Sequence, residues 1–119
     1  MGDVLRIALL TLVVLAACAP KSDPQKVADA MTHALYANDV AAFTSYLDDS
    51  TGATVTRGTF GALSDRMNRL GALATIAQHD ADPDKGRYTY DVTFAKGSML
   101  VEVRFDPSGK VGAYRVIPK

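Results

Sequence analysis

The only cysteine of the chain, Cys18, directly follows an apolar segment that begins at Ile7 and ends in the small residues Ala16 and Ala17. An N-terminal apolar segment that ends in small residues is typical of a secretory signal peptide. The segment is too short to span a bilayer, for which about 20 apolar residues are needed. The spacing therefore predicts a cleavage site at the end of the segment, with the single thiol of the chain beside it.

The sequence Leu15-Ala16-Ala17-Cys18 resembles the lipobox of bacterial lipoproteins. The resemblance implies cleavage between Ala17 and Cys18, transfer of a diacylglyceryl group to the Cys18 thiol, and acylation of the new amino group by a fatty acid such as palmitate. Membrane lipid is then the first expected partner. Ala19 stands where retained inner-membrane lipoproteins commonly carry aspartate, which favours the outer membrane, facing the periplasm, in a Gram-negative host. The competing interpretation is a core helix with a buried cysteine, but the segment is apolar on every face and lacks the stripe of a surface helix.

This interpretation divides the chain into a signal peptide (1–17), a lipidated cysteine with a short tether (18–23) and one domain (24–119). Removal of the signal peptide leaves 102 of the 119 residues, which is enough for a single core. The chain has 13 basic and 13 acidic residues, and the signal peptide contains one of each, so the mature protein is neutral. Neutrality argues against nucleic acid as a partner, because nucleic-acid binding needs a basic surface.

Three carboxylates at alternate positions, Asp80, Asp82 and Asp84, form the best candidate metal site. Calcium loops use such spacing, because calcium takes several oxygen ligands at once. However, Pro83 stiffens the middle of the segment, Gly86 falls one position late, and no helices are expected on either side. We therefore favour a solvated loop that joins two strands and predict no metal or cofactor, with a weak calcium loop as the alternative.

The sequence offers little catalytic chemistry. His79 lies next to Asp80, but adjacent residues of a strand point to opposite faces, which separates the two side chains. The chain contains no nucleophile elbow, phosphate loop or zinc-binding His-Glu-x-x-His motif. A binding protein is therefore favoured over an enzyme, although a small acid/base or hydrolytic enzyme remains an alternative.

A ligand pocket is the remaining possibility for chemistry. Tyrosine combines an apolar ring with a polar hydroxyl and is common in binding pockets. Arg115 is in phase with Val111 and Ile117 along the last predicted strand, so its side chain can point inward. The candidate pocket residues are Tyr36, Tyr46, Tyr90, Tyr114 and Arg115, and Tyr88 shares the pattern. The competing and favoured interpretation is that the tyrosines fill the core and extend their hydroxyls to its edge.

The elements that position these residues are three helices followed by four strands. A first helix begins at Pro24, with Ser22 or Asp23 as its cap, and Asp39 caps a second. A third begins at Thr56 or Thr59. Alternating apolar and polar residues predict strands over 73–78, 88–94, 99–105 and 111–117. Short turns predict an antiparallel meander with one apolar and one polar face.

Helices followed by strands predict an α+β fold, with the N-terminal helices packed on one face of a four-stranded antiparallel sheet. This order resembles the cone-like nuclear transport factor 2-like (cystatin-like) domains of small bacterial lipoproteins. The resemblance rests on residues 34–39, on residues 69–73 and on the ending Val103 to Val111. It implies a domain that binds a small ligand or an envelope protein. A structural lipoprotein that assembles with itself, for instance as a homodimer, is a further alternative.

Overall fold

The computed structural model describes residues 23–119, and its first element is helix α2 (Pro24–Tyr36). Asp23 caps this helix through its side chain, which accepts a hydrogen bond of 2.9 Å from a first-turn amide. Pro24 occupies the first helical position, where a missing N–H leaves no bond unmade. This start confirms the sequence prediction. The predicted signal peptide, Cys18 and the rest of the tether lie outside the described residues.

Three more helices follow in the described chain: the short helices α3 (Val40–Thr44) and α4 (Asp49–Gly52), and α5 (Arg57–Arg69), which is as long as α2. Asp39 caps α3, as predicted, and Thr56, one of the two predicted starts, caps α5. The one-turn helix α4 begins directly after Asp48, which caps it. The Asp48 side chain accepts a hydrogen bond of 2.8 Å from the Thr51 amide, which satisfies a free donor of that turn.

Asp48 makes the stability of this region dependent on pH. Hydrogen bonds from the side chain and backbone of Thr51 hold the pKa of Asp48 at about 2, below its usual 3.8. Because folding depresses this pKa, the stabilisation is complete above about pH 4 and is lost as the pH falls towards 2. We expect the urea midpoint of the wild type to fall more steeply over this range than that of Asp48→Asn. Asp49→Asn, which changes the adjacent exposed carboxylate, should follow the wild type; identical slopes for wild type and Asp48→Asn would contradict the assignment.

The second half of the described chain is a four-stranded sheet: β1 (Leu73–Asp82), β2 (Arg87–Phe94), β3 (Gly97–Phe105) and β4 (Val111–Pro118). The strand order is β1-β2-β3-β4 and every neighbouring pair is antiparallel, which confirms the predicted meander. Strand β1 extends four residues beyond the predicted end at residue 78, because residues 80–82 continue to pair with β2.

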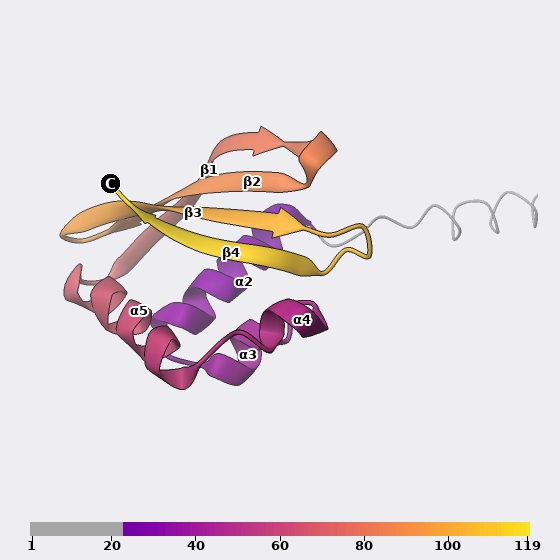
Figure 1. Ribbon diagram of the computed structural model, residues 1–119. Coiled ribbons are helices and arrows are strands. Elements are labelled where there is room, and N and C mark those ends of the chain that lie inside the picture. Colours follow the sequence, from indigo (N-terminus) through magenta and orange to yellow (C-terminus); the bar gives the residue numbers. More distant parts are fainter. Residues whose placement is uncertain (1–22) are drawn as a thin grey trace, which may run out of the picture.

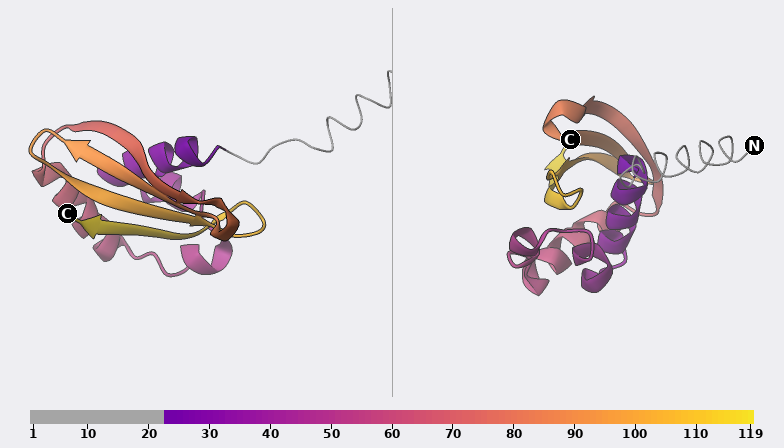
Figure 2. Two further views of the ribbon diagram at one scale, coloured as in Figure 1. Left: turned by 90° about the horizontal axis from the view of Figure 1, so that it is seen from above. Right: turned by 90° about the vertical axis from the view of Figure 1, so that its right-hand side faces the viewer.

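Helices α2 and α5 lie against one face of the sheet (Figure 1), and the sheet curves over them (Figure 2). The Asn68 side chain of α5 donates to the Tyr36 carbonyl of α2 at 2.8 Å, and Gln25 of α2 donates to the Ile76 carbonyl of β1 at 3.1 Å. This arrangement confirms the predicted α+β class, with helices packed on an open antiparallel sheet. The space between the two layers is filled by the fully buried side chains of Met31, Thr32, Leu35, Met67, Tyr90, Val92, Val101, Val103 and Val111.

A β-bulge interrupts the pairing of β4 with β3. Val111 pairs with Phe105 and Tyr114 pairs with Val103, so three steps along β4 match two steps along β3. The extra residue reverses the alternation of side chains, because a shift of one residue moves the following residues to the opposite face. As a result, both Val111 and Tyr114 face the helices. Val111 also forms an isolated parallel bridge with Leu47, which ties the segment before α4 to the sheet edge.

Candidate functional site

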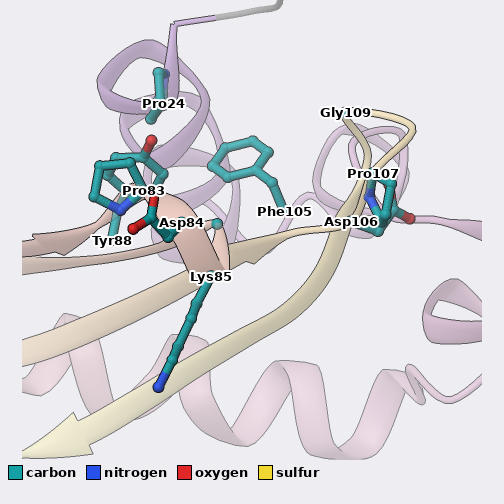
Figure 3. A pocket seen from close by; sticks show the side chains of 10 residues that line it. Pro24, Pro83, Asp84, Lys85, Tyr88, Phe105, Asp106, Pro107 and Gly109 are labelled. Atoms are coloured by element: carbon teal, nitrogen blue, oxygen red, sulfur yellow. The ribbon is translucent and has the colours of Figure 1, made fainter.

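A pocket of about 540 Å³ lies at one end of the sheet, where three segments meet (Figure 3). These segments are the start of α2, the connection between β1 and β2, which contains the short 3₁₀ helix η1 (Pro83–Lys85), and the turn between β3 and β4. The volume falls within the range typical of small-molecule sites. The lining residues are Pro24, Pro83, Asp84, Lys85, Gly86, Tyr88, Phe105, Asp106, Pro107 and Gly109.

Local turn chemistry holds the two connections in place. Gly86 ends η1 in the left-handed region at φ 66°, and its carbonyl accepts a 2.8 Å hydrogen bond from the Phe105 amide. In the other connection, the Asp106 carboxylate accepts bonds from the amides of Ser108 and Lys110 at 2.9 and 3.1 Å. Such Asx turns stabilise the backbone from within. The first wall is thus tied to the end of β3, whereas the second is stabilised by bonds within its own turn.

The pocket offers apolar and aromatic contact more than ionic recognition. Tyr88 and Phe105 meet edge to face with ring centroids 5.8 Å apart, which is a favourable geometry for an aromatic pair. The Lys85 side chain points away from the other labelled side chains (Figure 3). The Asp106 carboxylate is already engaged in its own turn. Asp84 is the remaining charged side chain, so the lining suits a ligand that is mainly apolar or aromatic.

The three carboxylates of the calcium hypothesis do not converge. Asp80 and Asp82 belong to strand β1, and only Asp84 lies in η1. Asp82 instead pairs with Arg87 at 3.4 Å across the β1–β2 ladder. Among residues 23–119, no three His, Cys, Asp or Glu side chains are grouped closely enough to hold a metal ion. The extended backbone of β1 keeps these side chains apart, whereas the backbone of a calcium loop curves so that its carboxylates converge on the ion.

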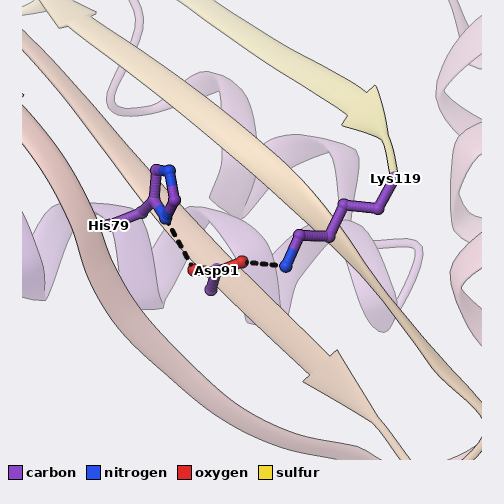
Figure 4. Close-up of polar contacts among 3 residues, drawn as sticks. All are labelled: His79, Asp91 and Lys119. Carbon is purple, nitrogen blue, oxygen red and sulfur yellow. Dashed lines mark hydrogen bonds and ion pairs between the residues drawn. The ribbon is translucent and has the colours of Figure 1, made fainter.

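His79 finds a carboxylate partner on the neighbouring strand. Its Nδ1 lies 2.9 Å from Oδ2 of Asp91, and the Lys119 amine lies 2.6 Å from the other oxygen of that carboxylate (Figure 4). The hydrogen bond from Lys119 lowers the pKa of Asp91 most, and His79 adds to the effect. His79 and Lys119 are half exposed on the open face of the sheet. A His–Asp pair can act as a base and its orienting partner, but this pair lies outside the pocket.

The predicted pocket tyrosines lie elsewhere than in this pocket. Tyr36 donates to the Gly71 carbonyl at 2.9 Å, and the hydroxyls of Tyr114 and Thr32 are 2.8 Å apart. Tyr46 is half-buried beside the core, and Tyr90 is completely buried. Tyr88 alone among the tyrosines lines the pocket. The core interpretation agrees with the positions of these rings, but the hydroxyl of Tyr90 is buried and does not reach the edge of the core.

Arg115 lies on the open face, opposite to the inward direction suggested by its phase with Val111. Its guanidinium is 3.5 Å from the Glu102 carboxylate, and two thirds of its side chain is exposed. The bulge in β4 explains the difference, because phase can be counted along a strand only where the pairing is regular. The side chain of Tyr114, the residue before Arg115, faces the helices instead.

No protein-family model, curated protein or solved structure matches this chain. Within residues 23–119, no helix combines the length and the apolar character needed to cross a membrane. The site must therefore be interpreted from its own geometry and from the N-terminal sequence.

Sequence reasoning missed most of the pocket lining, including Phe105 and the three prolines. A signal was present: Asp82-Pro83 and Asp106-Pro107 open two connections that a four-stranded meander brings to the same end of the sheet. The sequence contains no signal for the third wall, which Pro24 forms, because the position of Pro24 depends on the angle at which α2 packs on the sheet.

The buried hydroxyl of Tyr90 has no hydrogen-bond partner among the described residues. Burial raises the pKa of Tyr90 to about 12, and the neighbouring Tyr88, Asp23 and Asp29 add to the rise. Because an unpaired buried hydroxyl costs about 1–3 kcal/mol, we expect Tyr90→Phe to raise the free energy of unfolding by about 1 kcal/mol. Tyr114→Phe is the matched control and should lower it by a similar amount, since it breaks the bond to Thr32. Urea denaturation measures both; a destabilised Tyr90→Phe would show that the hydroxyl is satisfied.

Proposed function

We propose that the protein is a lipoprotein of the cell envelope, anchored through acylated Cys18, whose domain binds a ligand in the pocket between α2, η1 and the β3–β4 turn. The pocket of about 540 Å³ with its aromatic pair carries the binding part of this proposal. The apolar segment and the Leu15-Ala16-Ala17-Cys18 sequence support the anchor. The ligand is a small molecule or the apolar side chains of an envelope protein.

The α+β architecture supports, in coarse form, the resemblance to nuclear transport factor 2-like domains. Helices on one face of a curved antiparallel sheet are the arrangement which that resemblance implies. In this chain Met31, Met67 and Tyr90 fill the space between the helices and the sheet. We therefore place the ligand at the end of the sheet and not inside the cone. With Ala19 after the cysteine, we place the protein in the outer membrane, facing the periplasm, if the host is Gram-negative.

A non-catalytic role fits the site better than an enzymatic one. His79, the histidine of the described residues that pairs with a carboxylate, lies on the open sheet face with about half of its side chain exposed. General acid–base chemistry requires a base within hydrogen-bond reach of a bound substrate. The Asp84 and Asp106 carboxylates of the pocket have no histidine beside them in the lining.

Mass spectrometry of the full-length protein, produced in a Gram-negative host and extracted in mild detergent, tests both parts of the proposal. We expect the intact mass to show loss of residues 1–17 and three acyl chains, and Cys18→Ser to remain unprocessed. Under native conditions, the wild type should carry additional mass that Phe105→Ala loses. Leu100→Ala is the matched control, because it removes a half-buried side chain from the other face of the same strand. An unacylated chain would refute the anchor, and a bare wild type would refute the small ligand.

A further inference from the structure

The pocket lies at the end of the domain where the chain enters from its N-terminal segment. Pro24, the first residue of α2, forms one wall of the pocket. It is six positions after Cys18. Because an extended chain spans at most about 3.6 Å per residue, the pocket wall can be no more than about 20 Å from that cysteine. A membrane anchor at Cys18 would therefore keep this end of the domain near the bilayer.

The two ends of the sheet lie at different distances from the point where the tether joins the domain. Strand β2 runs from Arg87 at the pocket end to Phe94 at the other, and the β2–β3 turn at Ala95 and Lys96 lies beyond it. At about 3.3 Å per residue, the eight residues of β2 separate the two ends by about 25 Å. A tether attached at Pro24 thus favours one orientation, with the pocket towards the bilayer and the β2–β3 turn away from it.

The chemistry of the pocket end suits the boundary between lipid headgroups and acyl chains. Pro83 and Pro107 are exposed there, and the rings of Tyr88 and Phe105 are half-buried. Aromatic rings with a polar tip concentrate at this boundary, because one part is apolar and the other can reach water. The Lys85 side chain points away from the other labelled side chains (Figure 3) and can keep its amine in water while its methylene chain covers apolar surface.

We infer that the pocket end of the domain rests on the bilayer, with Tyr88 and Phe105 in the interfacial region and the pocket open towards lipid. This inference rests on the proposed anchor at Cys18. The partner of this surface is the bilayer interface. An amphiphile that enters the pocket can therefore arrive directly from the membrane. The apolar contacts carry the interaction, because the two acidic side chains of the lining, Asp84 and Asp106, outnumber its one lysine and give no net attraction to anionic lipid.

Depth-dependent quenching tests the orientation. The chain contains no tryptophan, so a single introduced tryptophan is the only one that emits. Full-length, acylated Phe105→Trp and Lys96→Trp are reconstituted separately into vesicles of phosphatidylethanolamine and phosphatidylglycerol that carry dibrominated acyl chains. Tyr88→Trp is a second reporter at the pocket end, used if Phe105→Trp does not fold. We expect bromine to quench tryptophan at the pocket end about twofold or more strongly than tryptophan at position 96.

The outcomes separate this inference from the proposed function. Stronger quenching at the pocket end supports the orientation. Equal quenching at both positions, with the acylated protein still sedimenting with the vesicles, overturns the orientation and leaves the anchor intact. A chain that is not acylated and does not sediment with vesicles overturns both.

Discussion

Replacing Phe43 with alanine is expected to lower the free energy of unfolding by about 3–5 kcal/mol. Phe43 is 5% exposed, and its ring meets Phe60 of α5 and Tyr114 of β4 edge to face, with centroid distances of 5.1 and 4.9 Å. It is the only buried residue of the five-residue helix α3. A helix this short has little stability of its own, so the contacts of Phe43 hold α3 between α5 and the sheet.

Urea denaturation followed by circular dichroism measures this effect. Phe43→Leu is the matched control: it keeps most of the buried volume and should cost less than half as much, about 1–1.5 kcal/mol. The alanine variant loses a large share of the stability expected for a domain of this size, about 5–15 kcal/mol, and should begin to unfold near 37 °C. A loss below about 1 kcal/mol for Phe43→Ala would contradict the packing of the three rings.

Replacing Gly86 with alanine is the second large effect, with an expected loss of about 2–4 kcal/mol. Gly86 adopts φ 66°, a left-handed conformation that costs an L-residue about 1–2 kcal/mol. A Cβ at this position would also lie 2.6 Å from the Phe105 carbonyl oxygen. Backbone oxygen cannot move aside as the end of a flexible side chain can. The substitution therefore strains the β1–β2 connection and displaces β3 at the pocket.

Gly58→Ala is the matched control for this substitution. Gly58 lies in α5, and a Cβ there meets nothing within 4 Å. Alanine should therefore stabilise the helix by up to about 1 kcal/mol, because it is the better helix former. Both variants replace glycine with alanine, but we expect the urea midpoint to fall for Gly86→Ala and to rise for Gly58→Ala. Gly86→Ala should also lose the bound mass that native mass spectrometry detects. If Gly86→Ala were as stable as the wild type, the close approach of the turn to Phe105 would be wrong.

Local interactions are the part of this fold that sequence reasoning predicted. The Asp23 cap with Pro24, the Asp39 cap and the Thr56 cap depend only on residues within one helical turn, and all three are present. The alternation in β2 and β3 also depends on neighbours in the chain, and these strands begin and end within two residues of the predicted bounds. Leu15-Ala16-Ala17-Cys18 remains a prediction of the same kind, since a peptidase reads it as a linear sequence.

Contacts between residues distant in the sequence decided the rest. One extra residue in the pairing of β4 moved Arg115 to the open face and Tyr114 towards the helices, and neither residue type reveals a bulge. His79 and Asp91 are twelve residues apart and meet only because β1 pairs with β2 in a particular register. The pocket combines Pro24, the η1 turn and the β3–β4 turn, whose approach is set by the packing of α2 on the sheet. Sequence determined the β3–β4 turn by itself, because its chemistry is local, whereas the extent of β1 before the η1 turn and the site that the turns form exist only through pairing and packing.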